Sequence, residues 1–321
     1  MPTSEAPLLS NFIAKSSASQ HTWLKYALAS FFFGAVGQFS MGFLSEDITS
    51  RYIISLGDLI FVIFCCFLKY FYFRFKNERW ANIKDCSWID PETGSMKQGT
   101  FKYLLLSIAT RFFYGYTIII AYAEANSEKM NIGIILSVRS CEALFAALWT
   151  YLLLKEKLSC SKLVGLFILT GGVVGLSLPS HSENVGFSLT GIIWALVAAL
   201  ISSLRNFTIK RLAESKVDGE TIVIHSVFWA DLITVLIGII SMIWGMGFNH
   251  EFFDKYLQQE SIEFTWRRFG LSVFIGFVIF FTLTTTANAT QHGYTGIILF
   301  ILYILRSYLY IFIFIRPGCR Y

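Results

Sequence analysis

Residues 131–178 read NIGIILSVRSCEALFAALWTYLLLKEKLSCSKLVGLFILTGGVVGLSL, and this stretch decides the fold. Two apolar runs flank the short basic turn Lys155–Lys157, and each is close to the ~20 residues that cross a hydrocarbon core of about 30 Å. The first run carries Arg139 and Glu142 at a depth where charge is costly, and the second is rich in glycine. The stretch therefore predicts two membrane-spanning helices joined by a tight turn.

The rest of the chain has the same character. Of its 321 residues, 55% are hydrophobic and only 15% are charged, whereas a soluble domain carries about 25% charged residues. The sequence predicts an all-α polytopic membrane protein embedded in a lipid bilayer, with nine transmembrane helices. These predicted spans are 23–44, 52–73, 101–122, 131–154, 163–180, 190–211, 222–245, 268–290 and 293–315.

The distribution of basic residues predicts the orientation. Three loops on one side of the membrane are rich in Lys and Arg: 74–100, 155–162 and 210–220. Loops on the other side are poor in them, with Arg51 in 45–51, Lys129 in 123–130 and none in 181–189. Positive loops stay inside, so the N-terminus is predicted to be cytoplasmic, without a choice between plasma membrane and endomembrane. The net charge of +5 thus reflects topology, and no nucleic-acid partner is expected.

The chain contains two matching halves. Gly57–Ile63 matches Ala230–Leu236, and the motif GIIL occurs at 133–136 and again at 296–299. Because a unit of five spans is odd in number, its copy must insert upside down, as in many secondary transporters. The predicted organisation is a cytoplasmic tail (1–22), a first five-helix repeat (23–180), a second, incomplete repeat (187–315) and a C-terminal tail (316–321). The second glycine helix falls beyond Tyr321, so a tenth helix is expected to be missing, through truncation, a gene-model error or splicing.

Charged residues within the spans are the candidates for substrate binding, because burying each one costs at least about 2.5–3.5 kcal/mol. Arg111 either pairs with a neighbouring carboxylate or faces an anionic ligand in a central cavity. Arg139 and Glu142 are three residues apart, so they either neutralise each other or Glu142 orients Arg139 toward a carboxylate or phosphate. Arg306 repeats the Arg139 motif in the last span.

Two aspartates occupy matching positions in the repeats, Asp58 and Asp231. They are interpreted as counter-ions for the arginines, with proton coupling and a purely structural role as alternatives. Helix packing is predicted at the small residues Gly171, Gly175, Ala195 and Ala199. Threonines between 282 and 286 either line a watery path or bond to their own backbone. The Cys and His residues form no metal-binding motif, so neither a metal nor a cofactor is predicted.

At the level of motifs, residues 131–178 resemble the end of an EamA-type repeat of the drug/metabolite transporter superfamily. The resemblance rests on Glu156-Lys-Leu-Ser159, Leu163-Val-Gly165 and Gly171-Gly172-Val173. It implies ten helices in two inverted repeats, alternating access and a central cavity. In nucleotide-sugar and triose-phosphate relatives, basic residues on the fourth and ninth helices hold phosphorylated substrates, and Arg139 and Arg306 resemble them in placement.

Together these patterns predict a secondary transporter of a small polar metabolite, anionic or phosphorylated, and no enzymatic activity. The alternative is a non-transporting membrane scaffold or degenerate paralogue. A membrane-embedded lipid enzyme is less favoured, because no nucleophile with an adjacent base is visible in the sequence. The sequence leaves open whether the chain forms a homodimer.

Overall fold

The computed structural model describes residues 25–45 with gaps, 50–81, 85–97 except 91, 99–154, five positions between 164 and 172, 188–248 and 262–292. Most of the predicted span 163–180 and all of 293–315 lie outside the described residues. The prediction that a tenth helix is missing also concerns residues outside the described ones.

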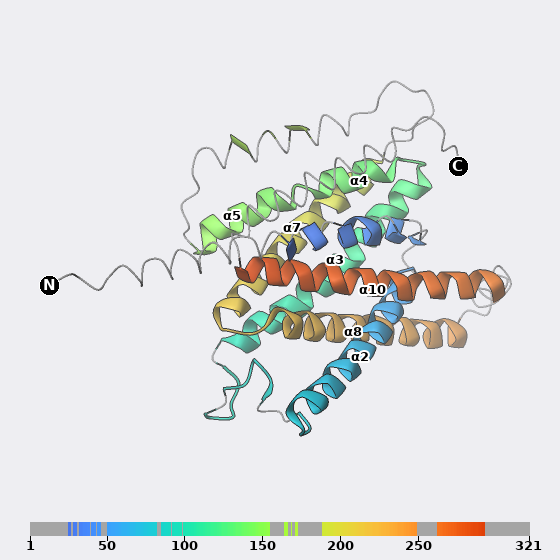
Figure 1. Ribbon diagram of the computed structural model, residues 1–321. Helices are drawn as coiled ribbons and strands as arrows, with labels where there is room; N and C mark the ends of the chain where they lie inside the picture. Colours follow the sequence, from blue (N-terminus) through green and yellow to red (C-terminus); the bar gives the residue numbers. More distant parts are fainter. Residues whose placement is uncertain are drawn as a thin grey trace.

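The described residues form a helical membrane protein (Figure 1). Its helices are α2 (Ser50–Asn77), α3 (Thr100–Ser127), α4 (Ile132–Arg139), α5 (Glu142–Leu154), α7 (Leu189–Glu214), α8 (Gly219–Phe248) and α10 (Ile262–His292). Taking α4 and α5 together, six helical segments are long and apolar enough to cross a membrane. A shorter apolar helix covers Leu28–Gly42 within the first predicted span. The predicted all-α polytopic fold is confirmed, whereas the inverted repeat and the domain boundaries stay predictions.

The fourth predicted span differs from expectation, because it is interrupted. Residues 131–154 were expected to form one continuous helix, but α4 ends at Arg139 and α5 begins at Glu142. At the break, the N–H groups of Ser140 and Cys141 donate to the carbonyls of Ser137 and Val138, three residues back. This tight 3₁₀ turn displaces the α-helical ladder next to the Arg139–Glu142 pair.

The helices pack in close pairs. α3 lies along α7, and α10 crosses α2, which also contacts α8 (Figure 1). The crossing of α2 and α10 depends on two glycines, because a Cβ on Gly57 would lie 2.4 Å from the Ser272 carbonyl and one on Gly276 would lie 2.7 Å from the Gly57 oxygen. Small residues bring these two backbones into contact, as in other membrane helix pairs.

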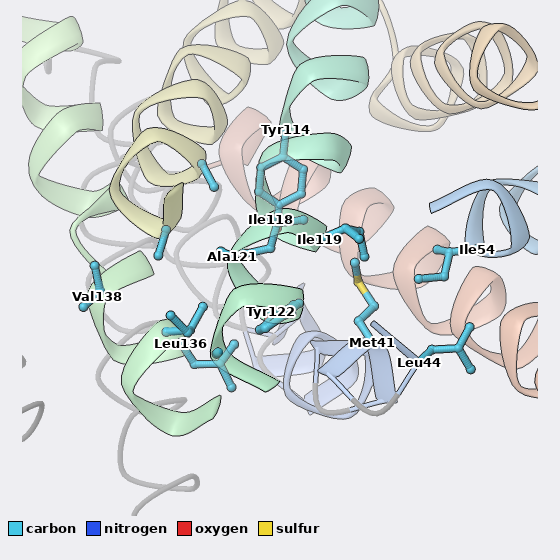
Figure 2. Close-up of a cluster of buried hydrophobic side chains, with 14 of the residues drawn as sticks. Met41, Leu44, Ile54, Tyr114, Ile118, Ile119, Ala121, Tyr122, Leu136 and Val138 are labelled. Carbon is cyan, nitrogen blue, oxygen red and sulfur yellow. The ribbon is translucent and has the colours of Figure 1, made fainter. Parts of the chain in front are cut away.

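Two apolar clusters form the core of the described helices. The first joins α2, α3, α4, α7 and α10 with the N-terminal helical segment, and Figure 2 draws most of it, including Tyr114, Ile118, Tyr122 and Met41. The second joins α2, α7, α8 and α10 around Val62, Leu212 and Ile222. Charged side chains are also buried in these helices.

Candidate functional site

Seven charged side chains are buried within the described helices. They are Arg51, Asp58, Arg111, Arg139, Glu142, Arg205 and Asp231. Four arginines face three carboxylates, which leaves one excess positive charge among the described residues. The excess charge lies within the described helices α2, α3, α4, α5, α7 and α8.

Four of these side chains are linked to one another by ion pairs: Arg51, Asp58, Arg111 and Asp231. We call this group the aspartate network. Arg51 donates from Nη2 to Asp231 Oδ1 at 2.7 Å, and the Ser55 hydroxyl donates to the same oxygen at 3.0 Å. Arg51 is fully buried in the first turn of α2. Arg51 was predicted to lie in the loop 45–51, outside the membrane, and this prediction is wrong. The helix α2 begins at Ser50, and the Arg51 side chain turns inward to Asp231 of α8.

Arg111 links the two aspartates. Its Nη2 donates to Asp58 Oδ2 at 2.5 Å and lies 3.5 Å from Asp231 Oδ2. The network thus joins α2, α3 and α8, and its two arginines balance its two carboxylates. This is the geometry expected of counter-ions, the alternative favoured for Asp58 and Asp231. Space for it comes from Gly115, since a Cβ there would lie 2.4 Å from Arg51 Cζ.

A cavity lies beside the network and has about 580 Å³ of empty space, its mouth included. Its lining comes from the first helical segment, α3, α4, α5, α7 and α10. The lining residues are Gly34, Gly37, Gln38, Met41, Arg111, Tyr114, Arg139, Glu142, Arg205, Asn206, Ile279, Thr282, Leu283 and Thr286. The structure thus brings Arg111, Arg139 and Glu142 together in one cavity. Asp58 and Asp231 lie behind Arg111, outside the lining.

Within the cavity, Arg139 and Glu142 are only loosely paired. Arg139 Nη2 and Glu142 Oε2 are 3.9 Å apart, and no hydrogen bond joins the two side chains. Glu142 instead accepts a 2.6 Å hydrogen bond from the Asn206 side-chain amide of α7. The two residues belong to different helices, so the expected continuous helix is corrected, but they remain neighbours as an ion pair three residues apart. Whether they neutralise each other or Glu142 orients Arg139 stays a prediction.

Arg205 of α7 is the cavity residue that sequence reasoning missed. Its side chain is buried, its Nε has no hydrogen-bond partner, and no described carboxylate lies within ion-pair distance. Glu142 attracts it only from a longer range. The signal was present in the sequence, because Arg205 lies inside the predicted span 190–211. It lies five residues before the predicted basic loop 210–220 and was not distinguished from the basic residues of that loop.

Tyr114 of α3 contacts two of the three arginines that line the cavity. Its ring lies 5.0 Å from Arg139 Cζ and 5.5 Å from Arg205 Cζ, within the range of a cation–π contact. Tyr114 is buried in the apolar cluster of Figure 2, and packing in that cluster fixes the position of its ring. One ring therefore holds two guanidinium groups of the cavity near each other.

The other predicted residues have separate outcomes. Ala195 and Ala199 are fully buried in α7, the helix that packs along α3. Gly171 is described but has no atom within 4 Å of a Cβ position, so its packing role stays a prediction. Arg306 and Gly175 lie outside the described residues. Thr282 and Thr286 bond to their own helix backbone and also line the cavity, so both interpretations of this polar helix hold.

Metal coordination has no candidate in the described part of the chain. No group of three or more His, Cys, Asp or Glu residues there is placed to hold an ion. The chemistry available in the cavity is therefore that of guanidinium, amide, phenol and carboxylate groups.

Comparison with known proteins identifies the family. The sequence profile of the triose-phosphate transporter family matches residues 117–292, more than half of the chain. The chain belongs to this family. The resemblance to the drug/metabolite transporter superfamily, predicted from residues 131–178, is thereby confirmed. The matched region runs from the middle of α3 to the end of α10 and includes Arg139, Glu142 and Arg205.

A bacterial relative agrees with this assignment. An uncharacterized transporter of Helicobacter pylori is 34% identical over 139 residues, which cover 43% of this chain and 44% of that protein. The match thus spans less than half of the relative's length. Together with the family match and the apolar helices, it supports a membrane transporter of small solutes.

Proposed function

We propose that this protein is a secondary transporter of a small anionic metabolite, bound between Arg139 and Arg205 and moved by alternating access. The observation that carries the proposal is Arg205, a buried guanidinium that lines the cavity with no ion-pair partner among the described residues. A buried charge without a partner is costly. An anionic solute in the cavity would supply the missing charge.

A phosphate or carboxylate group fits this site best. The planar guanidinium donates two parallel hydrogen bonds to such groups, and Arg139 and Arg205 both lie within 5.5 Å of the Tyr114 ring. The description of the family, triose-phosphate transporters, favours a phosphorylated metabolite among these anions. Arg111 also lines the cavity, but in the unliganded protein its guanidinium is held by Asp58 and Asp231, so Arg139 and Arg205 are the first contacts of the anion.

Alternating access belongs to the proposal because a transporter that binds solute between its helices must close each end of the site in turn. Tyr114 and Met41 belong both to the cavity lining and to the apolar cluster of Figure 2, so the cavity borders directly on packed side chains.

Thermal unfolding of the purified protein tests the anion site. Inorganic phosphate and phosphorylated sugars are expected to raise the unfolding temperature, whereas glucose leaves it unchanged, because a ligand stabilises the state that binds it. Arg205→Gln should abolish the phosphate response, and Arg205→Lys should retain part of it. The matched control is Arg211→Gln on the same helix, since Arg211 is partly exposed and pairs with Glu214 at 2.8 Å.

Transport itself is tested in proteoliposomes loaded with phosphate. External labelled phosphate should enter by exchange, and entry should fall at least about tenfold in Arg205→Gln, which corresponds to about 1.4 kcal/mol. A protein that neither binds nor exchanges any anion in these two assays would contradict the proposal and favour the scaffold alternative.

A further inference from the structure

Arg111 belongs to both charged groups of the bundle. It lines the cavity with Arg139 and Arg205, and it is also the cation that holds Asp58 at 2.5 Å and faces Asp231 at 3.5 Å. Among the described residues, it alone both lines the cavity and belongs to the aspartate network. An anion in the cavity and the two buried carboxylates therefore compete for one guanidinium.

The two carboxylates lie close to each other because of Arg111. Its Nη2 is within 3.5 Å of both Asp58 Oδ2 and Asp231 Oδ2. Each aspartate also has a buried oxygen that lacks a hydrogen-bond donor, Oδ1 of Asp58 and Oδ2 of Asp231. The network thus contains two buried carboxylate oxygens that receive no hydrogen bond from any described group. A proton on one carboxyl group would supply the missing donor.

The charged and titratable groups around Asp58 are few. On its own helix lies Arg51, with Tyr52 nearby. α3 contributes Arg111, with Tyr116 beside Tyr52, and α8 contributes Asp231. α10 approaches with the backbone of Ser272 and Gly276, and its Ser272 hydroxyl bonds to the Phe269 carbonyl. If Arg111 turns to an anion, Arg51 is left as the one full cation for two carboxylates.

We propose that anion binding in the cavity is coupled to the uptake of one proton by the Asp58–Asp231 pair. The inference rests on the proposed function. The anion draws Arg111 from Asp58, and the carboxylate left in a water-poor interior takes a proton from solvent and becomes a neutral carboxylic acid. Asp231 keeps its charge because Arg51 still donates to it.

The coupling balances the charges of the buried centre. Before binding, two arginines neutralise two aspartates; after binding, Arg111 neutralises one charge of the anion, and a proton neutralises Asp58. No bond other than the new O–H forms, and nothing is oxidised or reduced. A dianion, held by Arg205 and Arg111, would thus enter the site together with one proton, which makes a proton gradient a driving force for its movement.

Proton uptake on binding can be measured directly with the full-length protein in detergent. Sulfate is the probe, because it does not titrate near neutral pH, and a pH indicator in weakly buffered solution reports the protons. About one proton should be taken up per sulfate bound. By linkage, the affinity for sulfate should then rise by up to about tenfold for each unit by which the pH falls.

The variant Asp58→Asn isolates the proton site. It should bind sulfate with little or no proton uptake and with an affinity independent of pH, because an asparagine amide cannot take up the proton and Asp231 keeps its charge beside Arg51. The matched control is Asp218→Asn, an aspartate at the end of the bundle that faces Lys69 at 3.7 Å and should leave the proton uptake unchanged. If Asp58→Asn does not fold, the pH dependence of sulfate binding by the wild type still decides.

Three results separate the two proposals. Proton uptake that is lost in Asp58→Asn supports the coupling. Wild-type protein that binds sulfate without taking up protons, and with the same affinity at every pH, overturns the coupling and leaves the anion transporter intact. Wild-type protein that binds neither sulfate nor phosphate overturns the proposed function, and the coupling fails with it.

Discussion

The bundle contains two buried groups of arginines and carboxylates, and they are built in opposite ways. In the aspartate network, two arginines meet two aspartates at 2.5 and 2.7 Å. In the cavity, Arg139 stands 3.9 Å from Glu142, and Arg205 has no described carboxylate in ion-pair reach. The same residue types therefore serve two purposes. Charges that neutralise each other hold helices together, and charges left in excess can hold a ligand.

The contacts around the ion pairs differ between the two groups. Near Asp58, Gly57 and Gly276 let the α2 and α10 backbones touch, and Gly115 leaves room for the Arg51 guanidinium. At the cavity, Glu142 stands 3.9 Å from Arg139 and accepts its 2.6 Å hydrogen bond from the Asn206 amide of α7. Close packing accompanies the short ion pairs of the network, whereas an amide holds the carboxylate of the cavity.

The largest effect is expected from breaking the network. Asp231→Leu leaves Arg51 buried without its carboxylate, and the loss of one partner of a buried pair costs about 3–5 kcal/mol. Unfolding of the purified protein in mixed micelles measures this cost. The double variant Arg51→Met with Asp231→Leu should recover most of it, since it removes both charges. A double variant as unstable as the single one would show that the pair is not the source of the loss.

A smaller loss is expected at the helix crossing that supports the network. Gly57→Ala places a Cβ 2.4 Å from the Ser272 carbonyl, and because backbone atoms must shift, the cost is about 1–3 kcal/mol. Gly270→Ala on α10 is the control, since nothing lies within 4 Å of its Cβ position. The control should be neutral or slightly stabilising. Equal unfolding temperatures for the two variants would argue against a tight crossing.

Removing Arg205 and removing Arg51 should change the stability of the unliganded protein in opposite directions. Arg205→Gln removes a buried cation that lacks an ion-pair partner, so the unliganded protein should be unchanged or slightly more stable. Arg51→Gln should lower the stability. Unfolding temperatures of both variants without added anions test this contrast. A large loss of stability in Arg205→Gln would assign Arg205 to the structural group.

The smallest effect is expected outside the membrane spans, at Asp218. Burial raises the pKa of the Asp218 carboxyl. Hydrogen bonds from Ser87 and Thr221 and the charge of Lys69 lower it, and together they outweigh burial, so the pKa lies below its usual range. Its charge therefore stabilises the fold fully above the ordinary aspartate pKa of about 4, and this contribution is lost as the pH falls through the lower folded-state pKa.

Asp218→Asn keeps the shape of the side chain and removes only the charge, and the cost should stay below about 1 kcal/mol, since Asp218 and Lys69 are both partly exposed. Unfolding midpoints at neutral and acidic pH measure it. The difference from wild type should shrink in acid, and a difference that grows in acid would contradict the assignment.

Much of the site could be predicted from the sequence. Arg111, Arg139, Glu142, Asp58 and Asp231 were identifiable because a charge inside an apolar run is costly and needs a reason. Arg51 and Arg205 were missed because they lie near span ends, where a basic residue looks like a loop residue. One turn of helix, about 5.4 Å, separates a loop arginine from a buried one, and span boundaries cannot be read from composition that finely.

The sequence by itself determined the class of protein, because long apolar runs have only one stable solution in a lipid bilayer, the helix that satisfies its own backbone. It also determined the family, through motifs that lie close together along the chain. Only the tertiary structure decided which charges neutralise each other. Arg51 and Asp231 are 180 residues apart, and their pairing depends on how α2 and α8 cross. The break at Ser140 and the position of Arg205 beside Tyr114 likewise depend on packing between helices, which no local pattern encodes.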